Sequence, residues 1–396
     1  MAKVGIIGAG FVGATAAYAM MLNGTCSEIV LIDANEARAK AEAADIAHGA
    51  PLARGVRAYA GSYADLQGAV LVVIAAGSNQ KPGESRLNLL ARNAAIFASI
   101  VPQVVAVAPE AVVLIVSNPV DIMTSITRAL HPTPELVMGS GTILDSARFR
   151  QLIGERAGVN ARYVHSYTLG EHGDSSVMCW SSALIAGMPV ATFMSERQIP
   201  WGKKEMDDIA TNVRGAALSI IAGKNATYYG IGIAVNSLAD AIINDRHAVF
   251  TVSGDSPFDE VCLSLPRLIG RRRILDDAVV LAELVEAHMS RLGLDLEPLG
   301  TRLVLHVELA QVAVEVRVVE GLARVLIGRV AVPLELVLHV GGVRLLLETL
   351  VDVLLRVADL GPAVVAGDLR SGVGVYLRQR RARGLYKVAD VGEGHG

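Results

Sequence analysis

The sequence has few of the residues on which several classes of protein depend. It contains three cysteines, Cys26, Cys179 and Cys262, which lie far apart and lack the spacing of metal ligands. We therefore expect reduced thiols in the core, with neither a disulfide framework nor a metal site. The net charge of −3 gives no strong field of one sign, so nothing favours a nucleic acid as a partner.

The chain also lacks an apolar stretch of about 18 residues free of charges and helix breakers. It begins with MAKVGIIGAG rather than with the basic segment and apolar run of a signal peptide. These absences predict a cytoplasmic protein without a membrane span. The chain has 396 residues, 52% of them hydrophobic, which is enough for a large core and for two or three domains.

The last third of the chain lacks three residue types that the rest contains. Residues 271–396 have no Asn, Phe or Trp and a single Lys, whereas Leu and Val make up 50 of these 126 residues. This composition sets 272–396 apart as an aberrant Leu/Val/Arg-rich tail. The sequence leaves several hypotheses open for it: a reading-frame shift in a GC-rich gene near codon 271, a fused regulatory or interaction domain, an unusual β-rich extension, or disorder.

Residues 1–270 alternate short apolar strands with helical stretches. We expect strands at 4–9, 28–33, 69–77 and 111–119. Apolar strands separated by helices indicate a parallel sheet that is covered on both faces. The fold class is therefore α/β, with a Rossmann-type sheet.

A glycine-rich motif follows the first of these strands. In Gly8-Ala9-Gly10-Phe11-Val12-Gly13, the first glycine permits a tight turn, the second lets a pyrophosphate approach the backbone, and the third allows close helix packing. Asp33 ends the second strand, 20 residues after the motif, where a carboxylate accepts hydrogen bonds from ribose hydroxyls and repels a 2′-phosphate. We therefore predict NAD rather than NADP as the cofactor. The residues predicted to bind it are Gly8, Gly10, Phe11, Val12, Gly13 and Asp33.

Four further segments carry a family resemblance. They are AAGSNQKPGESRLNLL (75–90), VSNPVD (116–121), GSGTILDSARFR (139–150) and LGEHGDS (169–175). With the glycine motif, they resemble the bacterial-type L-lactate dehydrogenases of the lactate/malate dehydrogenase superfamily, over residues 1–271. The resemblance implies an NAD-binding domain over 1–141, and an α+β substrate domain over 142–271 that lacks the C-terminal part of the family domain. It also implies a homotetramer that interconverts pyruvate and L-lactate.

The resemblance assigns the chemistry to four residues. Reduction of a 2-keto acid needs a proton donor that titrates near neutral pH, and His172 matches the family's acid/base. Asp145 matches the carboxylate that pairs with this histidine and raises its pKa. Arg148 matches the arginine that holds the substrate carboxylate through two parallel hydrogen bonds. Arg86 matches an arginine of the mobile loop that polarises the carbonyl when the loop closes.

Three other residues bear on which substrate is taken. Gln80 stands where malate dehydrogenases have an arginine, and a neutral side chain does not compensate the second carboxylate of oxaloacetate, which favours pyruvate. Asn118 resembles the residue that binds substrate and positions the nicotinamide, and Thr227 the residue beside the substrate's small side chain. The alternatives are a malate or other 2-hydroxy-acid dehydrogenase, and an NAD-binding protein whose altered C-terminus impairs catalysis.

Arg150 and His165 resemble two residues that bind fructose 1,6-bisphosphate between subunits in allosteric members of the family. A phosphate group needs cations, and a symmetric interface brings two copies of each cation together. The bland interpretation is a structural arginine and an ordinary strand histidine. The sequence leaves both interpretations open.

Overall fold

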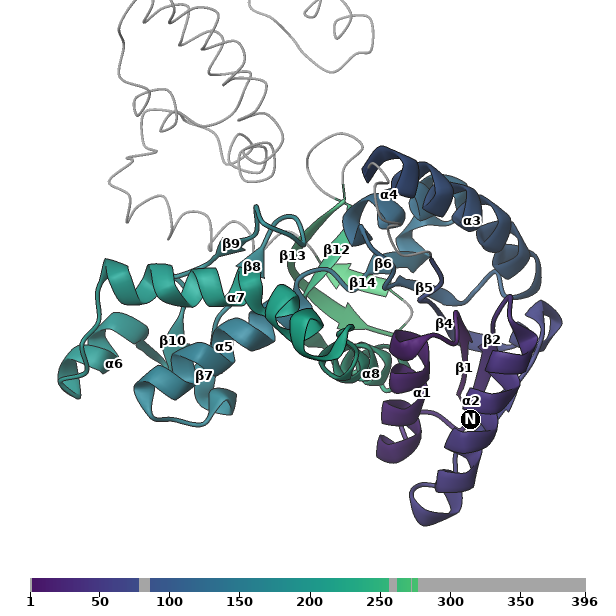
Figure 1. The fold of residues 1–396 in the computed structure, drawn as a ribbon, viewed down its shortest axis with the longest axis horizontal. Coiled ribbons are helices and arrows are strands. Elements are labelled where there is room, and N and C mark those ends of the chain that lie inside the picture. Colours follow the sequence, from purple (N-terminus) through teal and green to yellow (C-terminus); the bar gives the residue numbers. More distant parts are fainter. Residues whose placement is uncertain (1, 78–85, 256–261, 272, 277–396) are drawn as a thin grey trace, which may run out of the picture. The chain divides into compact units, whose positions relative to one another are not determined.

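The computed structural model describes residues 2–77, 86–255, 262–271 and 273–276 (Figure 1). Gln80 lies outside the described residues, and so does the expected tail over 272–396, apart from 273–276. The strands of the main sheet are β1 (Lys3–Ile7), β2 (Glu28–Ile32), β3 (Arg57–Ala60), β4 (Ala69–Ile74), β5 (Val112–Ile115), β6 (Val137–Gly139), β12 (Ala248–Gly254), β13 (Leu263–Gly270) and β14 (Arg273–Asp276).

These strands form one sheet in the order β14-β13-β12-β6-β5-β4-β1-β2-β3. The six strands β1 to β6 pair in parallel, in the doubly wound order 3-2-1-4-5-6. The predicted parallel sheet is therefore confirmed. β12, β13 and β14 extend it as antiparallel strands, which the sequence pattern had not indicated.

Successive side chains of each strand point to opposite faces of the sheet. Because successive residues of these strands are apolar, both faces are apolar and helices cover both. Ile6 packs into a core beneath one set of helices, while its neighbour Ile7 packs into the core of the other face. The first set is α1 (Phe11–Asn23), α2 (Glu36–Gly49) and α8 (Tyr229–Ile243). The second set is α3 (Arg86–Val107) and α4 (Val120–Leu130), on the opposite side in Figure 1.

Helix α3 bears on the expectation that the chain has no membrane span. By length and composition alone, its segment Asn88–Val107 is long and apolar enough to cross a membrane. Phe97, Val101 and Val104 of this segment are buried in the core between α3 and the sheet. The helix therefore packs one face against the sheet, and 28% of its most apolar window is buried.

A further core lies beside the sheet. Phe149, Trp180 and Trp201 pack edge to face in sequence, and apolar side chains of the surrounding helices enclose them. The helices of this part are α5 (Ile143–Ala157), α6 (Val190–Glu196) and α7 (Lys203–Lys224). Its short strands are β7 (Val164–His165), β8 (Thr168–Leu169), β9 (Val177–Met178), β10 (Leu184–Ile185) and β11 (Met188–Pro189). This mixed α and β region matches the expected second part of the fold.

Candidate active site

His172 and Asp145 lie in direct contact. Asp145 is in the first turn of α5, and His172 is in the loop between β8 and β9. The Nδ1 atom of His172 is 2.6 Å from Oδ2 of Asp145. The Asp145 side chain is buried, whereas 29% of the His172 side chain is exposed. One ring nitrogen is thus held by the protein while the residue keeps access to the outside.

The pKa values of this pair move apart. Burial acts to lower the pKa of His172, but the hydrogen bond and negative charge of Asp145 outweigh burial and raise it above its ordinary value. Burial acts to raise the pKa of Asp145, but the contact with His172 and the charge of Arg148 outweigh it and lower the value. The arrangement therefore favours an imidazolium beside a carboxylate.

Asp145 also fixes an arginine. Its second oxygen, Oδ1, accepts a hydrogen bond of 2.9 Å from Nη1 of Arg148. The two residues are three positions apart on α5 and therefore share a helix face. One buried carboxylate thus holds His172 and Arg148 through separate oxygens, which fixes an imidazole and a guanidinium relative to each other.

A second buried carboxylate supports His172 from its backbone. Oδ2 of Asp121, in the first turn of α4, accepts a hydrogen bond of 2.8 Å from the His172 amide. Burial raises the pKa of Asp121, and its charge contributes to the raised pKa of His172. Asp121 is not among the predicted site residues, although it is the last residue of VSNPVD. The acidic residue at the end of that motif is the sequence feature that could have indicated it.

The loop that carries His172 is anchored at both ends. Gly170 exchanges two backbone hydrogen bonds, of 2.9 and 3.0 Å, with Ser264 of β13. At the other end, the carbonyl of Ser176 accepts hydrogen bonds from the Arg214 guanidinium of α7, the shorter of them 2.8 Å. Neither Ser264 nor Arg214 was predicted, because contacts between residues so far apart in the chain leave no local pattern.

The glycine motif forms a backbone cradle that fits a dinucleotide. Gly8 has φ +101°, and a Cβ there would lie 2.6 Å from the backbone nitrogen of Ala76, so only glycine fits the turn. A Cβ on Gly10, by contrast, meets nothing within 4 Å and points into open space. The opening of α1 therefore presents unobstructed backbone, which is what a pyrophosphate needs.

Asp33 lies beside this cradle. Its Oδ2 accepts a hydrogen bond of 2.7 Å from the Ala9 amide, and its Oδ1 accepts one of 2.8 Å from the Asn35 amide. The carboxylate is thus fixed at the end of β2, next to the turn at the end of β1. This position fits the ribose of a dinucleotide.

The remaining predicted residues lie at separate places. Asn118 follows β5, and its carbonyl accepts a hydrogen bond from the Asn93 side chain. Thr227 directly precedes Tyr228, the N-cap of α8. Arg86 is the first residue of α3.

Arg150 and His165 lie on neighbouring elements. The Nε of Arg150, on α5, donates a hydrogen bond of 2.8 Å to the carbonyl of Val164, the residue before His165 on β7. His165 is exposed. Arg150 therefore contacts the backbone of the strand that carries His165.

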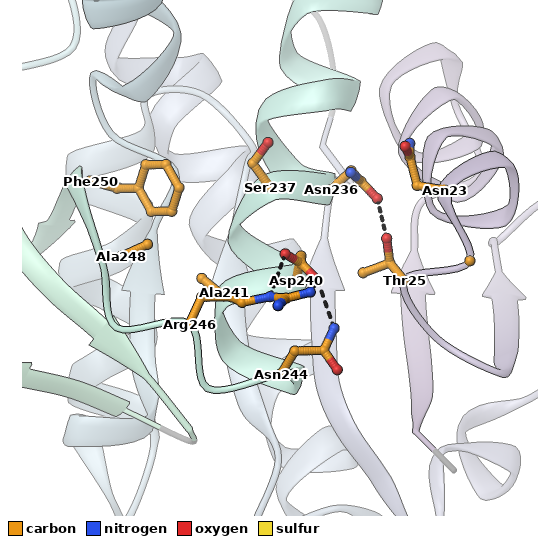
Figure 2. Close-up of a pocket in the computed structure, with 11 residues that line it drawn as sticks. Asn23, Thr25, Asn236, Ser237, Asp240, Ala241, Asn244, Arg246, Ala248 and Phe250 are labelled. Carbon is orange, nitrogen blue, oxygen red and sulfur yellow. Dashed lines mark hydrogen bonds and ion pairs between the residues drawn. The ribbon is translucent and has the colours of Figure 1, made fainter. Parts of the chain in front are cut away.

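A polar hollow of about 430 Å³ lies at the far end of α1 from the glycine motif (Figure 2). Thr25 and Asn236 line one side, and Asp240 and Arg246 form an ion pair of 3.0 Å in its wall. None of the predicted site residues lines this hollow. It is therefore separate from the candidate active site.

Comparisons with known proteins agree with this geometry. The model of the lactate/malate dehydrogenase NAD-binding domain matches residues 2–137, and the model of the family's alpha/beta C-terminal domain matches residues 142–281. The match thus continues beyond Arg271, and β14 continues the sheet there.

The matches to individual relatives span most of each relative's length. L-lactate dehydrogenases of Deinococcus radiodurans and Chloroherpeton thalassium are each 54% identical over 273 residues, which is 69% of this chain and 90% of theirs. The crystal structure of a ligand-bound minor L-lactate dehydrogenase from Enterococcus mundtii is similar, with a TM-score of 0.67 and 38% identity. The match covers 74% of this chain and 96% of that one. With both family domains matched in order around the His172–Asp145 pair, this chain belongs to the lactate/malate dehydrogenase family.

Proposed function

We propose that this protein is an L-lactate dehydrogenase that transfers hydride reversibly between NADH and pyruvate. The observation that carries the proposal is the single buried carboxylate of Asp145, which holds His172 at 2.6 Å and Arg148 at 2.9 Å. An acid/base and a carboxylate-binding cation in fixed relation are what reduction of a 2-keto acid requires. The names of the relatives at 54% identity support the same activity.

His172 supplies the proton. Its Nδ1–H donates to Asp145, so the proton at Nε2 is the one given to the carbonyl oxygen of pyruvate. The product is an alcohol and the imidazole is left neutral, still hydrogen-bonded to Asp145. In the direction of lactate oxidation, Nε2 accepts the hydroxyl proton, and the nearby carboxylate stabilises the imidazolium that forms.

The glycine motif and Asp33 would hold NAD, which would supply the hydride for pyruvate reduction as NADH and take it up in lactate oxidation as NAD⁺. Arg148 binds the substrate carboxylate through its planar guanidinium. Arg86 polarises the substrate carbonyl, and Asn118 hydrogen-bonds the substrate. Thr227 limits the size of the substrate side chain, and Gln80 selects pyruvate over oxaloacetate.

The experiment that tests this function follows NADH oxidation by the full chain with pyruvate and with oxaloacetate. We expect a higher kcat/KM with pyruvate. Replacing Gln80 with arginine supplies the charge that the second carboxylate of oxaloacetate needs, so it should shift the preference toward oxaloacetate by about tenfold or more. A wild-type preference for oxaloacetate would overturn the substrate assignment.

We also propose that the enzyme is a cytoplasmic homotetramer activated by fructose 1,6-bisphosphate. The contact of Arg150 with the strand that carries His165 supports a shared phosphate site, which a two-fold axis would double. The bisphosphate should raise kcat/KM for pyruvate, and this activation should disappear in His165→Ala, which removes one side of the phosphate site. Equal rates with and without the bisphosphate would contradict the proposal.

A further inference from the structure

Helices α1 and α8 begin side by side and run in the same direction. Near their first residues, the rings of Phe11 and Tyr228 stack with centroids 5.3 Å apart and planes 21° apart. One turn further on, Gly232 lies so close to α1 that a Cβ there would come within 2.6 Å of Thr15. At the far end, Thr25 donates a buried hydrogen bond of 2.6 Å to Asn236, as Figure 2 shows. The two helices therefore pack closely along the length of α1.

The beginning of this pair joins two parts of the candidate site. Phe11 is the residue after Gly10 in the glycine motif, and Tyr228 is the residue after Thr227. The proposed cofactor cradle and the proposed substrate wall thus meet through one pair of rings. Phe11 is 60% exposed although it is a large apolar side chain, so it contributes little to the core.

Tyr228 is held from its other side by a cation. Nζ of Lys224, the last residue of α7, lies 3.4 Å from the centroid of the Tyr228 ring and 3.8 Å from that of Tyr229. The hydrogen bond from Lys224, followed by that from Tyr229, lowers the pKa of the Tyr228 hydroxyl. Thr227 therefore lies in a short turn between Lys224 and Tyr228, and the side chains at the two ends of this turn contact each other.

We propose that Tyr228 is a positioning residue: its ring, held between Phe11 and Lys224, fixes Thr227 relative to the glycine motif. The inference rests on the proposed function and adds a link between the cofactor and substrate sides of the same site. Through this link, ordering of the glycine motif by NADH orders the substrate wall, and loss of the stack loosens both.

A double-mutant cycle tests the link. Phe11→Leu and Tyr228→Leu each remove one ring, and each should raise the NADH dissociation constant and the KM for pyruvate by about two- to tenfold, the range of an aromatic pair. The double variant should be little worse than either single variant, because each already breaks the same contact. The kcat should change less than KM, because the His172–Asp145 pair is untouched. Tyr228→Phe keeps the ring and should restore wild-type values.

Tyr18→Leu is the matched control, because Tyr18 is an exposed aromatic residue of the same helix. NADH affinity is read from the fluorescence of the bound cofactor and does not require turnover. A wild-type chain that binds NADH but does not reduce pyruvate contradicts the proposed function, while the cycle still reports on the link. The link would be overturned if Tyr228→Leu and Tyr18→Leu had the same NADH dissociation constant and KM for pyruvate. It would also be overturned if the fold-changes of Phe11→Leu and Tyr228→Leu multiplied in the double variant. If Tyr228→Leu does not fold, a wild-type NADH affinity in Phe11→Leu overturns it equally.

Discussion

At the scale of single residues, the charge of Asp145 decides how His172 titrates. Because this carboxylate raises the pKa of His172, the imidazolium persists to a higher pH than in a free histidine. Pyruvate reduction uses the imidazolium, so kcat/KM should be at its plateau below that raised pKa and be lost as pH rises through it.

Asp145→Asn removes the negative charge beside His172. Burial, which lowers the pKa of His172, then becomes the main effect on that pKa. We expect the alkaline limb of the pyruvate pH profile to move to lower pH, with a loss of about tenfold or more in kcat/KM near neutral pH. The profile of kcat/KM from steady-state assays measures this. Asp207→Asn, on the exposed face of α7, is the control. A limb that stays at the wild-type position would show that Asp145 does not set the pKa of His172.

Asp121 should act on the same profile more weakly. Its charge raises the pKa of His172, but less than the hydrogen bond and charge of Asp145 do. Asp121→Asn should therefore shift the alkaline limb in the same direction by a smaller amount, in the same assay. A shift as large as that of Asp145→Asn would contradict this ranking of the two carboxylates.

Motifs predicted the His172–Asp145 contact but not Asp121's role. The family pattern places Asp145 and His172 in named positions, so their pairing follows from the resemblance. The bond from the His172 amide to Asp121 joins residues 51 positions apart, and a backbone donor leaves no mark on the sequence.

At the scale of elements, four of the six parallel strands were predicted, whereas the short parallel strands β3 and β6 and the antiparallel strands were not. β1, β2, β4 and β5 are apolar runs between helices, the pattern of strands buried on both faces. β13 contains Pro266, which lacks an amide donor, and Arg267, which is completely buried. Both are atypical of an interior strand, so the sequence obscured it. β7 to β11 span two residues each, too few to show a period.

The close packing of α1 on α8 gives a prediction about stability. Gly232→Ala places a Cβ within 2.6 Å of Thr15 Cγ2, so the helices must separate, and we expect a loss of about 1–3 kcal/mol in the free energy of unfolding. Gly223→Ala is the matched control, because a Cβ there meets nothing and α7 gains a better helix former, worth about 0.5–1 kcal/mol. Urea denaturation measures both. Equal stability of the two variants would contradict the close approach.

At the scale of the whole molecule, we propose an NAD-binding domain over 1–141, a substrate domain over 142–271 and an atypical tail over 272–396. The two family models support the first boundary, since they end and begin at residues 137 and 142. Composition alone predicted a change near residue 271, because residues 271–396 contain no Asn, Phe or Trp. The second family model ends ten residues later, at residue 281.

We propose that this change reflects a reading-frame shift. Codons rich in G and C give excess Arg, Leu, Val, Gly and Ala when they are read out of frame. Another frame of the coding DNA beyond codon 271 should therefore encode a segment similar to the C-termini of the relatives. Nucleotide sequencing measures this directly. Codon usage in 272–396 that matches the usage in residues 1–270 would contradict the frame shift and favour a fused domain.

A chimera measures what the tail does to catalysis. Replacing 272–396 with the corresponding C-terminal segment of the Deinococcus radiodurans enzyme restores the length of family sequence that the relatives carry. If the tail impairs closure of the site, kcat for pyruvate should rise in the chimera while NADH affinity stays the same. Equal kcat in both proteins would show that residues 1–271 hold what turnover requires.

The most direct test of the account is the rate of pyruvate reduction by the full chain against His172→Gln, with NADH affinity measured in both. A general acid contributes about 10²- to 10⁴-fold, so we predict a loss of kcat/KM in that range with unchanged NADH binding. A His172→Gln enzyme that keeps wild-type turnover, or a wild-type chain that binds NADH without reducing pyruvate, would contradict the central claim.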